Sequence, residues 1–298
     1  MSLRKKGICF IITTAAFFAF VFFPVYSHAA TSVSLQIFPQ TIPQGGTAVI
    51  MLTPKPKGIL SVVTGKVGSR QVTFFPYGGR YIGFYSAPAK AAPRWYPVSV
   101  VVDGSLIKTA VGIKSSEFSV TTLPVVPELE QKGFAPKAVA SNLKDDTPTL
   151  LTAASNPLPT PIFSESFRYP LDEVVVTGPF GDYYRQGSVT LEHLGVDLHA
   201  ATGTPVYAVN DGKVVLTKEL SNYGNTLMID HGARIFSLYL HLERFAVTSG
   251  AMVKKGDVIG YSGDTGYAIG PHLHFSMWVN GTSIDPLAFI SATRQAMQ

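Results

Sequence analysis

Side chains that can bind a metal ion gather in three short clusters in the second half of the 298-residue chain. The clusters are His193 with Asp197, Tyr239 with His241, and His272 with His274. Side chains alternate between the two faces of a β-strand, so residues two or four positions apart share a face. Imidazole nitrogens and a carboxylate oxygen suit Zn²⁺, and a catalytic zinc uses three such ligands and leaves a fourth position for water. Together the clusters predict a metal site, whereas any one histidine alone would be read as a half-buried strand residue.

The segments that carry these clusters are predicted to be β-strands. Gly195 and the small residues of 200–205 argue against a helix around His193. In the second cluster we expect the flanking leucines to face away from Tyr239 and His241. Residues 167–290 keep this glycine-rich strand pattern and contain six of the seven histidines, so we predict one β domain there.

At this point the sequence resembles a known family, the M23 zinc metallopeptidases of the lysostaphin and LytM type, which are peptidoglycan endopeptidases. The resemblance rests on His193-x-x-x-Asp197, Tyr239-x-His241 and Gly270-Pro-His-Leu-His-Phe275, and on their order along the chain. It extends to Thr177-Gly-Pro-Phe-Gly181 and to the glycine-rich run 260–266. It covers about 120 residues, 167–290, and implies an M23-type antiparallel β-sheet metallopeptidase domain.

The resemblance also implies a role for each site residue. His193, Asp197 and His274 match the zinc ligands, with one Zn²⁺ per chain. His241 and His272 match the two active-site histidines that do not bind the metal. One of them would move the proton of the attacking water and the other would steady the oxyanion, and the sequence leaves open which does which.

Two further positions carry open alternatives. His199 lies where the family commonly has a small or apolar residue, so it could compete as a ligand, orient a ligand, or be a partly exposed strand residue. Tyr239 could hydrogen-bond the substrate or brace its strand.

The first half of the mature chain has a different character. Residues 31–122 read as short alternating strands separated by Gly, Pro and Asp-Gly turns, which predicts an immunoglobulin-like β-sandwich. The last predicted strand there is 118–122. Residues 123–166 are proline-rich and predict a linker with one short helix around 128–142, while Lys144–Pro148 is expected to form neither helix nor sheet. Residues 291–298 are expected to be a tail, and the fold class is all-β.

The N-terminus has the pattern of a secretory signal. Arg4, Lys5 and Lys6 precede an apolar run over 7–25 and then small residues, which predicts a signal peptide over residues 1–29 with cleavage after Ala29. An uncleaved inner-membrane anchor is the alternative, because the apolar run is long. Both place the mature chain outside the cytoplasm, either in the periplasm or extracellular and associated with the cell wall, with membrane contact only if the segment is retained.

Charge argues against a nucleic-acid partner. The formal charge is +5, and three of the positive charges lie in the first six residues, so the mature chain has no basic footprint for DNA or RNA. The expected partner is peptidoglycan, and the oligomeric state is left open. The function alternatives are a non-catalytic M23-like protein that binds wall or activates an amidase, and a secreted zinc peptidase acting on glycine-rich or ordinary protein.

Overall fold

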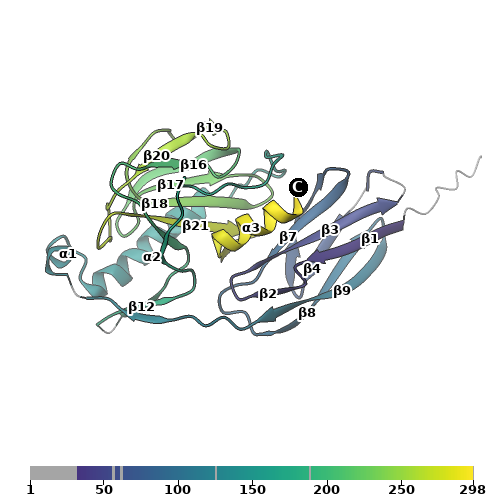
Figure 1. Cartoon of the computed structure of the whole chain (residues 1–298), viewed down its shortest axis with the longest axis horizontal. Coiled ribbons are helices and arrows are strands. Elements are labelled where there is room, and N and C mark those ends of the chain that lie inside the picture. The colour runs from purple at the N-terminus through teal and green to yellow at the C-terminus, as the bar shows by residue number, and fades with distance from the viewer. Residues whose placement is uncertain (1–31, 56–57, 61–62, 125, 188, 298) are drawn as a thin grey trace, which may run out of the picture. The chain divides into compact units, whose positions relative to one another are not determined.

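The computed structural model describes residues 32–55, 58–60, 63–124, 126–187 and 189–297 (Figure 1). The predicted signal or anchor falls outside these residues, so its cleavage stays a prediction. Within the described residues, no helix is both long enough and apolar enough to cross a membrane. The residues from Ser32 onward form one unit in which strands far outnumber the three helices, which confirms the all-β class.

The N-terminal strands form two sheets that enclose one apolar core, a β-sandwich as predicted. One sheet has the order β1 (Ser32–Phe38), β3 (Thr47–Lys55), β7 (Arg80–Ser86) and β6 (Phe74–Tyr77). The other has the order β2 (Thr41–Pro43), β9 (Ser105–Lys114), β8 (Arg94–Val102), β4 (Val63–Val67) and β5 (Arg70–Val72). Buried residues such as Ile50 from the first sheet and Val98 and Val111 from the second belong to the same cluster.

A larger sheet of ten strands forms the C-terminal part (Figure 1). Its main path is β11 (Val176–Gly178), β14 (Val196–His199), β21 (His272–Val279), β18 (Ile235–Phe245), β17 (Gly224–Asp230), β16 (Gly212–Leu220) and β19 (Met252–Val253). Three short strands pair at its margins, namely β15 (Pro205–Tyr207), β20 (Val258–Ser262) and β22 (Thr282–Ile284). The strands on the main path are all antiparallel to their neighbours, which is why short turns can connect several of them.

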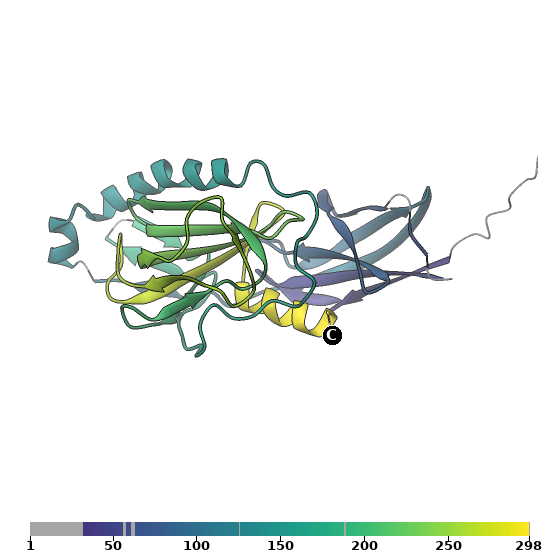
Figure 2. The ribbon, with the colours of Figure 1, turned by 90° about the horizontal axis from the view of Figure 1, so that it is seen from above.

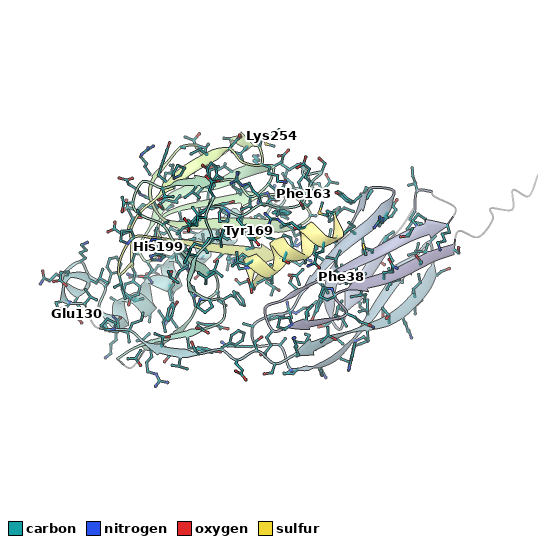
Figure 3. The ribbon with its side chains drawn as sticks, in the orientation of Figure 1. Phe38, Glu130, Phe163, Tyr169, His199 and Lys254 are labelled. Atoms are coloured by element: carbon teal, nitrogen blue, oxygen red, sulfur yellow. The ribbon has the colours of Figure 1, made fainter. Side chains whose placement is uncertain are left out.

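One face of this sheet is a continuous apolar core. Leu273, Phe275 and Met277 of β21 are fully buried on it, together with residues of β14, β17 and β18. The same cluster includes Phe84 of the sandwich and Phe289 of α3 (Pro286–Ala296). The centroids of these two rings lie 5.1 Å apart. Phe163, labelled in Figure 3, contacts the ring of Phe75 at 5.8 Å. The sandwich therefore keeps its own inner core and also shares a second core with the large sheet and α3.

The stretch predicted as a linker is largely structured, which corrects the sequence reading. It forms α1 (Pro127–Gln131) and the 18-residue helix α2 (Pro136–Ala153), which includes Lys144–Pro148. Pro148 costs a helix interior about 3 kcal/mol, and the burial of Val139 and Leu150 offsets that cost. In both views α2 lies beside the large sheet (Figures 1 and 2), where Leu150 packs against Met228 and Leu238.

The last strand predicted for the sandwich also lies elsewhere. Strand β10 (Val120–Thr122) pairs in parallel with β12 (Tyr183–Gln186), which pairs with β13 (Val189–Glu192) in a separate three-stranded sheet. The predicted C-terminal tail is likewise structured, because α3 extends to Ala296 and its Asp285 cap accepts hydrogen bonds from the N–H groups of Leu287 and Ala288.

Candidate active site

A groove of about 1010 Å³ lies on the second face of the large sheet, opposite the shared core. Leu238 and Leu240 of β18 and Ser276 and Trp278 of β21 line it from the sheet. Helix α2 contributes apolar residues, and β10, β12 and β13 contribute residues from the three-stranded sheet. No described residue of the sandwich strands lines this groove. The five histidine and aspartate residues with predicted roles in metal binding and catalysis all line it, namely His193, Asp197, His241, His272 and His274.

Three of these residues meet at one point. Asp197 of β14 lies directly opposite His274 of β21 in the strand register, so the pairing of the two strands places the carboxylate beside the imidazole. His274 Nδ1 lies 2.8 Å from Asp197 Oδ1, and His193 Nε2 lies 3.0 Å from both of those atoms. These are the described residues whose ligand atoms could hold a metal ion together.

The outward-facing nitrogen of each imidazole donates a hydrogen bond, which fixes the ring. His193 Nδ1 donates to the carbonyl of Pro179 at 2.8 Å. The hydroxyl of Ser276 donates its proton to the carbonyl of Leu194, so it can only accept from His274. His274 Nε2 therefore donates to this hydroxyl at 3.0 Å. In the neutral rings, the inward nitrogens therefore carry lone pairs aimed at the carboxylate. Two lone pairs and an anion at 3 Å repel one another unless a cation lies between them.

Burial alone would raise the pKa of Asp197, but the hydrogen bonds and charges of the His193 and His274 rings, when these are protonated, hold that pKa well below its usual range. Tyr184 of β12 contacts the other oxygen, with its hydroxyl 3.4 Å from Oδ2. The backbone at Gly195 comes so close to His274 and Ser276 that a Cβ there would collide with both, which explains the glycine between the two ligand positions.

The other two histidines lie next to this triad. The rings of His241 and His272 are 4.9 Å apart, and His272 Nε2 is 3.6 Å from Asp197 Oδ1. His241 Nδ1 donates to the carbonyl of Thr265, and His272 Nδ1 donates to that of Gly270, both at 2.8 Å. Each ring thus has a free Nε2 lone pair when neutral. Burial and the nearby imidazoles lower the pKa of His241 to about 3.

Comparison with known proteins identifies this arrangement. Residues 191–286 match the sequence profile described as Peptidase family M23. The chain contains an M23 peptidase domain.

Two curated relatives and one solved structure illustrate the extent of the likeness. A protein named DD-carboxypeptidase/endopeptidase Mpg from Neisseria meningitidis is 36% identical over 132 residues, which is 43% of this chain and 30% of that protein. A protein named Peptidoglycan DD-endopeptidase ShyA from Vibrio cholerae is 38% identical over 123 residues, which is 40% of this chain and 29% of that protein. The match thus spans less than a third of each relative. An M23 peptidase structure from Pseudomonas aeruginosa shares the fold, with a TM-score of 0.60 at 24% identity over 84% of this chain and 94% of that one.

The structure corrects two expectations about the M23 domain. Tyr239 does not reach the groove, because it is fully buried in the shared core and its hydroxyl accepts hydrogen bonds from Val209 N–H and Ser237. The leucines at 238 and 240 line the groove instead. The alternation fails because His241 has a left-handed backbone (φ +59°), which turns its side chain to the groove face. Tyr239 therefore braces the strand.

His199 is an exposed residue at the end of β14 and is not part of the metal-binding cluster among the described residues (Figure 3). Its backbone lies opposite His272 in the strand register, but its ring is not among the ligand atoms that converge in the cluster. It is the partly exposed strand residue that the sequence allowed as one alternative.

The groove includes elements that the sequence reading did not place there. Helix α2 lines the groove, and Tyr267 donates a hydrogen bond to Gln186 across the groove at 2.9 Å. One signal could have revealed the helix, since Val139, Leu143 and Leu150 recur at helical spacing through the proline-rich stretch. No comparable signal marks Tyr184 or Gln186.

Proposed function

We propose that this protein is an exported zinc metalloendopeptidase that hydrolyses peptide bonds in peptidoglycan cross-links or stems. The observation that carries the proposal is the convergence of two imidazole lone pairs and one carboxylate beside two further imidazoles in one groove. The pattern of the first 29 residues supports export, and the name of the Vibrio cholerae relative supports peptidoglycan as the substrate.

The chemistry of the triad fits zinc. The donors are two nitrogens and one oxygen, and the outer hydrogen bonds to Pro179 and Ser276 hold the rings in the tautomers that a metal requires. His193, Asp197 and His274 would hold the ion. When bound, zinc supplies a Lewis acid that polarises the scissile carbonyl and makes water a better nucleophile near neutral pH.

The remaining chemistry falls to His272 and His241. His272 accepts the proton of the attacking water at Nε2 and delivers it to the leaving amine. The carboxylate of Asp197, 3.6 Å away, offsets the positive charge that the ring acquires. His241 is suited to a neutral role, because burial opposes its protonation, and its Nε2 lone pair can orient the water.

The test is digestion of purified sacculi, pentaglycine and casein in parallel by the wild-type protein, with and without chelator. We expect zinc-dependent release of soluble muropeptides, and mass spectrometry of the fragments identifies the bond. Cleavage of pentaglycine or casein but not of sacculi would favour the glycine-rich or ordinary protein substrate. Binding to sacculi without any cleavage would favour a non-catalytic protein.

The matched variant for this test is His193→Ala, which removes one metal donor. Activity that persists in this variant, or in the wild type after removal of zinc, would contradict the proposal.

A further inference from the structure

Helix α2 is joined to the catalytic domain through one buried carboxylate. Asp146 is 4% exposed, and its two oxygens accept hydrogen bonds from the backbone N–H groups of Ser221 and Asn222, at 3.0 and 2.8 Å. These residues form the turn between β16 and β17. The side chain of Asn222 donates back to the carbonyl of Val139 on the helix at 2.6 Å and accepts from Asn142 at 3.2 Å. The contact is thus reciprocal and buried.

The same turn supports the backbone around His241. The carbonyl of Tyr223 accepts the N–H of His241 at 3.0 Å. The carbonyl of Asn222 accepts the N–H of Tyr267 at 2.8 Å, in the loop whose Thr265 carbonyl holds His241 Nδ1. Both the backbone of His241 and the acceptor that sets its tautomer are therefore anchored to residues 221–223.

The turn and the loop are packed with no space between their backbones. A Cβ at Gly224 would collide with the backbone of Thr265, and a Cβ at Gly266 would collide with the backbone of Gly224 and Asn222. Displacement of the turn cannot be absorbed by a gap, so it passes to the loop and to His241. His241 also holds a positive φ, a backbone conformation that persists only where its surroundings enforce it.

We propose that Asp146 is a positioning residue for hydrolysis, which holds the 221–223 turn and through it sets the backbone and ring orientation of His241. The proposal rests on the proposed function, since it assigns α2 to the catalytic machinery of that same site. The helix lies outside residues 191–286, where the family match is found. Helix α2, within the stretch 123–166 that was predicted to be a linker, would then be part of the enzyme.

The test compares Asp146→Asn with Asp145→Asn in the full mature chain. The amide of the first variant keeps the shape of the carboxylate but presents an NH₂ group to a backbone N–H. Asp145 is the exposed neighbour on the same helix and serves as the control. With a purified cross-linked muropeptide dimer as substrate, we expect Asp146→Asn to lower kcat by roughly 10- to 100-fold with KM and zinc content unchanged. Asp145→Asn should match the wild type.

Amide hydrogen exchange measures the coupling between Asp146 and the backbone of His241 without any substrate. Asp146→Asn should speed exchange at the amides of His241 and Tyr267, while the amide of His193, which donates to Asp182, stays protected. An unchanged kcat, or unchanged exchange at His241, would overturn the proposal. An inactive wild type that still shows the exchange response would overturn the proposed function alone.

If Asp146→Asn does not fold, Asn142→Ala tests the same contact through one hydrogen bond to Asn222. A smaller fall in kcat with zinc and KM retained would support the proposal. A kcat equal to that of the wild type would contradict it.

Discussion

The two faces of the large sheet differ in chemistry although they are built from the same strands. Along β21, Leu273, Phe275 and Met277 point into the core shared with the sandwich and α3, and none of them is exposed. The residues that alternate with them, His272, His274 and Ser276, face the groove. A strand alternates its side chains, so one eight-residue segment can supply both the packing and the polar site.

The groove face carries the residues proposed for metal binding and catalysis, whereas the core face carries the packing that stabilises the fold. The sandwich packs on the core side through aromatic contacts with Phe163 and with Phe289 of α3, and none of its described strand residues lines the groove. The groove face is bordered by α2 and by the three-stranded sheet of β10, β12 and β13. Substitutions on the groove face should therefore change metal binding and rate, and substitutions on the core face should change the free energy of unfolding.

The largest expected effect is loss of the metal. His193→Ala should remove bound zinc and lower the rate at least ~10³-fold, because it deletes one of three donors in the triad. Metal analysis and muropeptide release check both. His199→Ala is the matched control, an exposed histidine near the end of the same segment, and should keep zinc and rate. Normal turnover by His193→Ala would break the ligand assignment.

A smaller loss of rate is expected for the neighbouring imidazole. His272→Ala should keep its zinc and lose roughly 10²–10⁴ in kcat, because it removes the proposed proton acceptor and none of the donors. Zinc content and kcat are measured on the same sample. Loss of zinc from this variant would mean that His272, rather than His274, is the ligand.

On the core face, Phe289→Ala should lower stability and leave the chemistry alone. Phe289 is fully buried against Phe84 and Phe167, so its truncation should cost about 3–5 kcal/mol in the free energy of unfolding. Denaturant unfolding measures that cost, and kcat is measured at a temperature where the variant is folded. A large fall in kcat with unchanged stability would contradict the claim that the core face contributes to stability and not to catalysis.

The smallest effect concerns pH. His231 is completely buried on the core side, and burial lowers its pKa to about 4 from an ordinary value of about 6.5. The unfolded chain takes up this proton first as the pH falls, so stability present above pH 6.5 is lost between about 6.5 and 4, by up to about 3 kcal/mol.

Unfolding of His193→Ala with and without His231→Gln isolates this effect from metal release. The double variant should show a flatter pH dependence across that window. An identical slope in both proteins would show that His231 is not the group responsible.

The sequence predicted the parts of the site that depend on strand alternation and motif order. The two-residue spacing of His272 and His274 placed both side chains on one face, as observed. Alternation failed at Tyr239, because the left-handed backbone of His241 has no signature in the sequence. The helix predicted around 128–142 covers only the first part of α2; the rest was missed because Pro148 argues against a helix, and burial against Met228 and Leu238 compensates for it.

The most direct test of the account is a zinc-edge anomalous difference map from crystals of the wild-type protein. The account predicts a single peak bonded to His193 Nε2, Asp197 Oδ1 and His274 Nδ1, at about 2.0–2.2 Å from each, with His241 and His272 unbound beside it. A peak coordinated by His241, His272 or His199, or no peak at the triad in a protein that cleaves peptidoglycan, would contradict it.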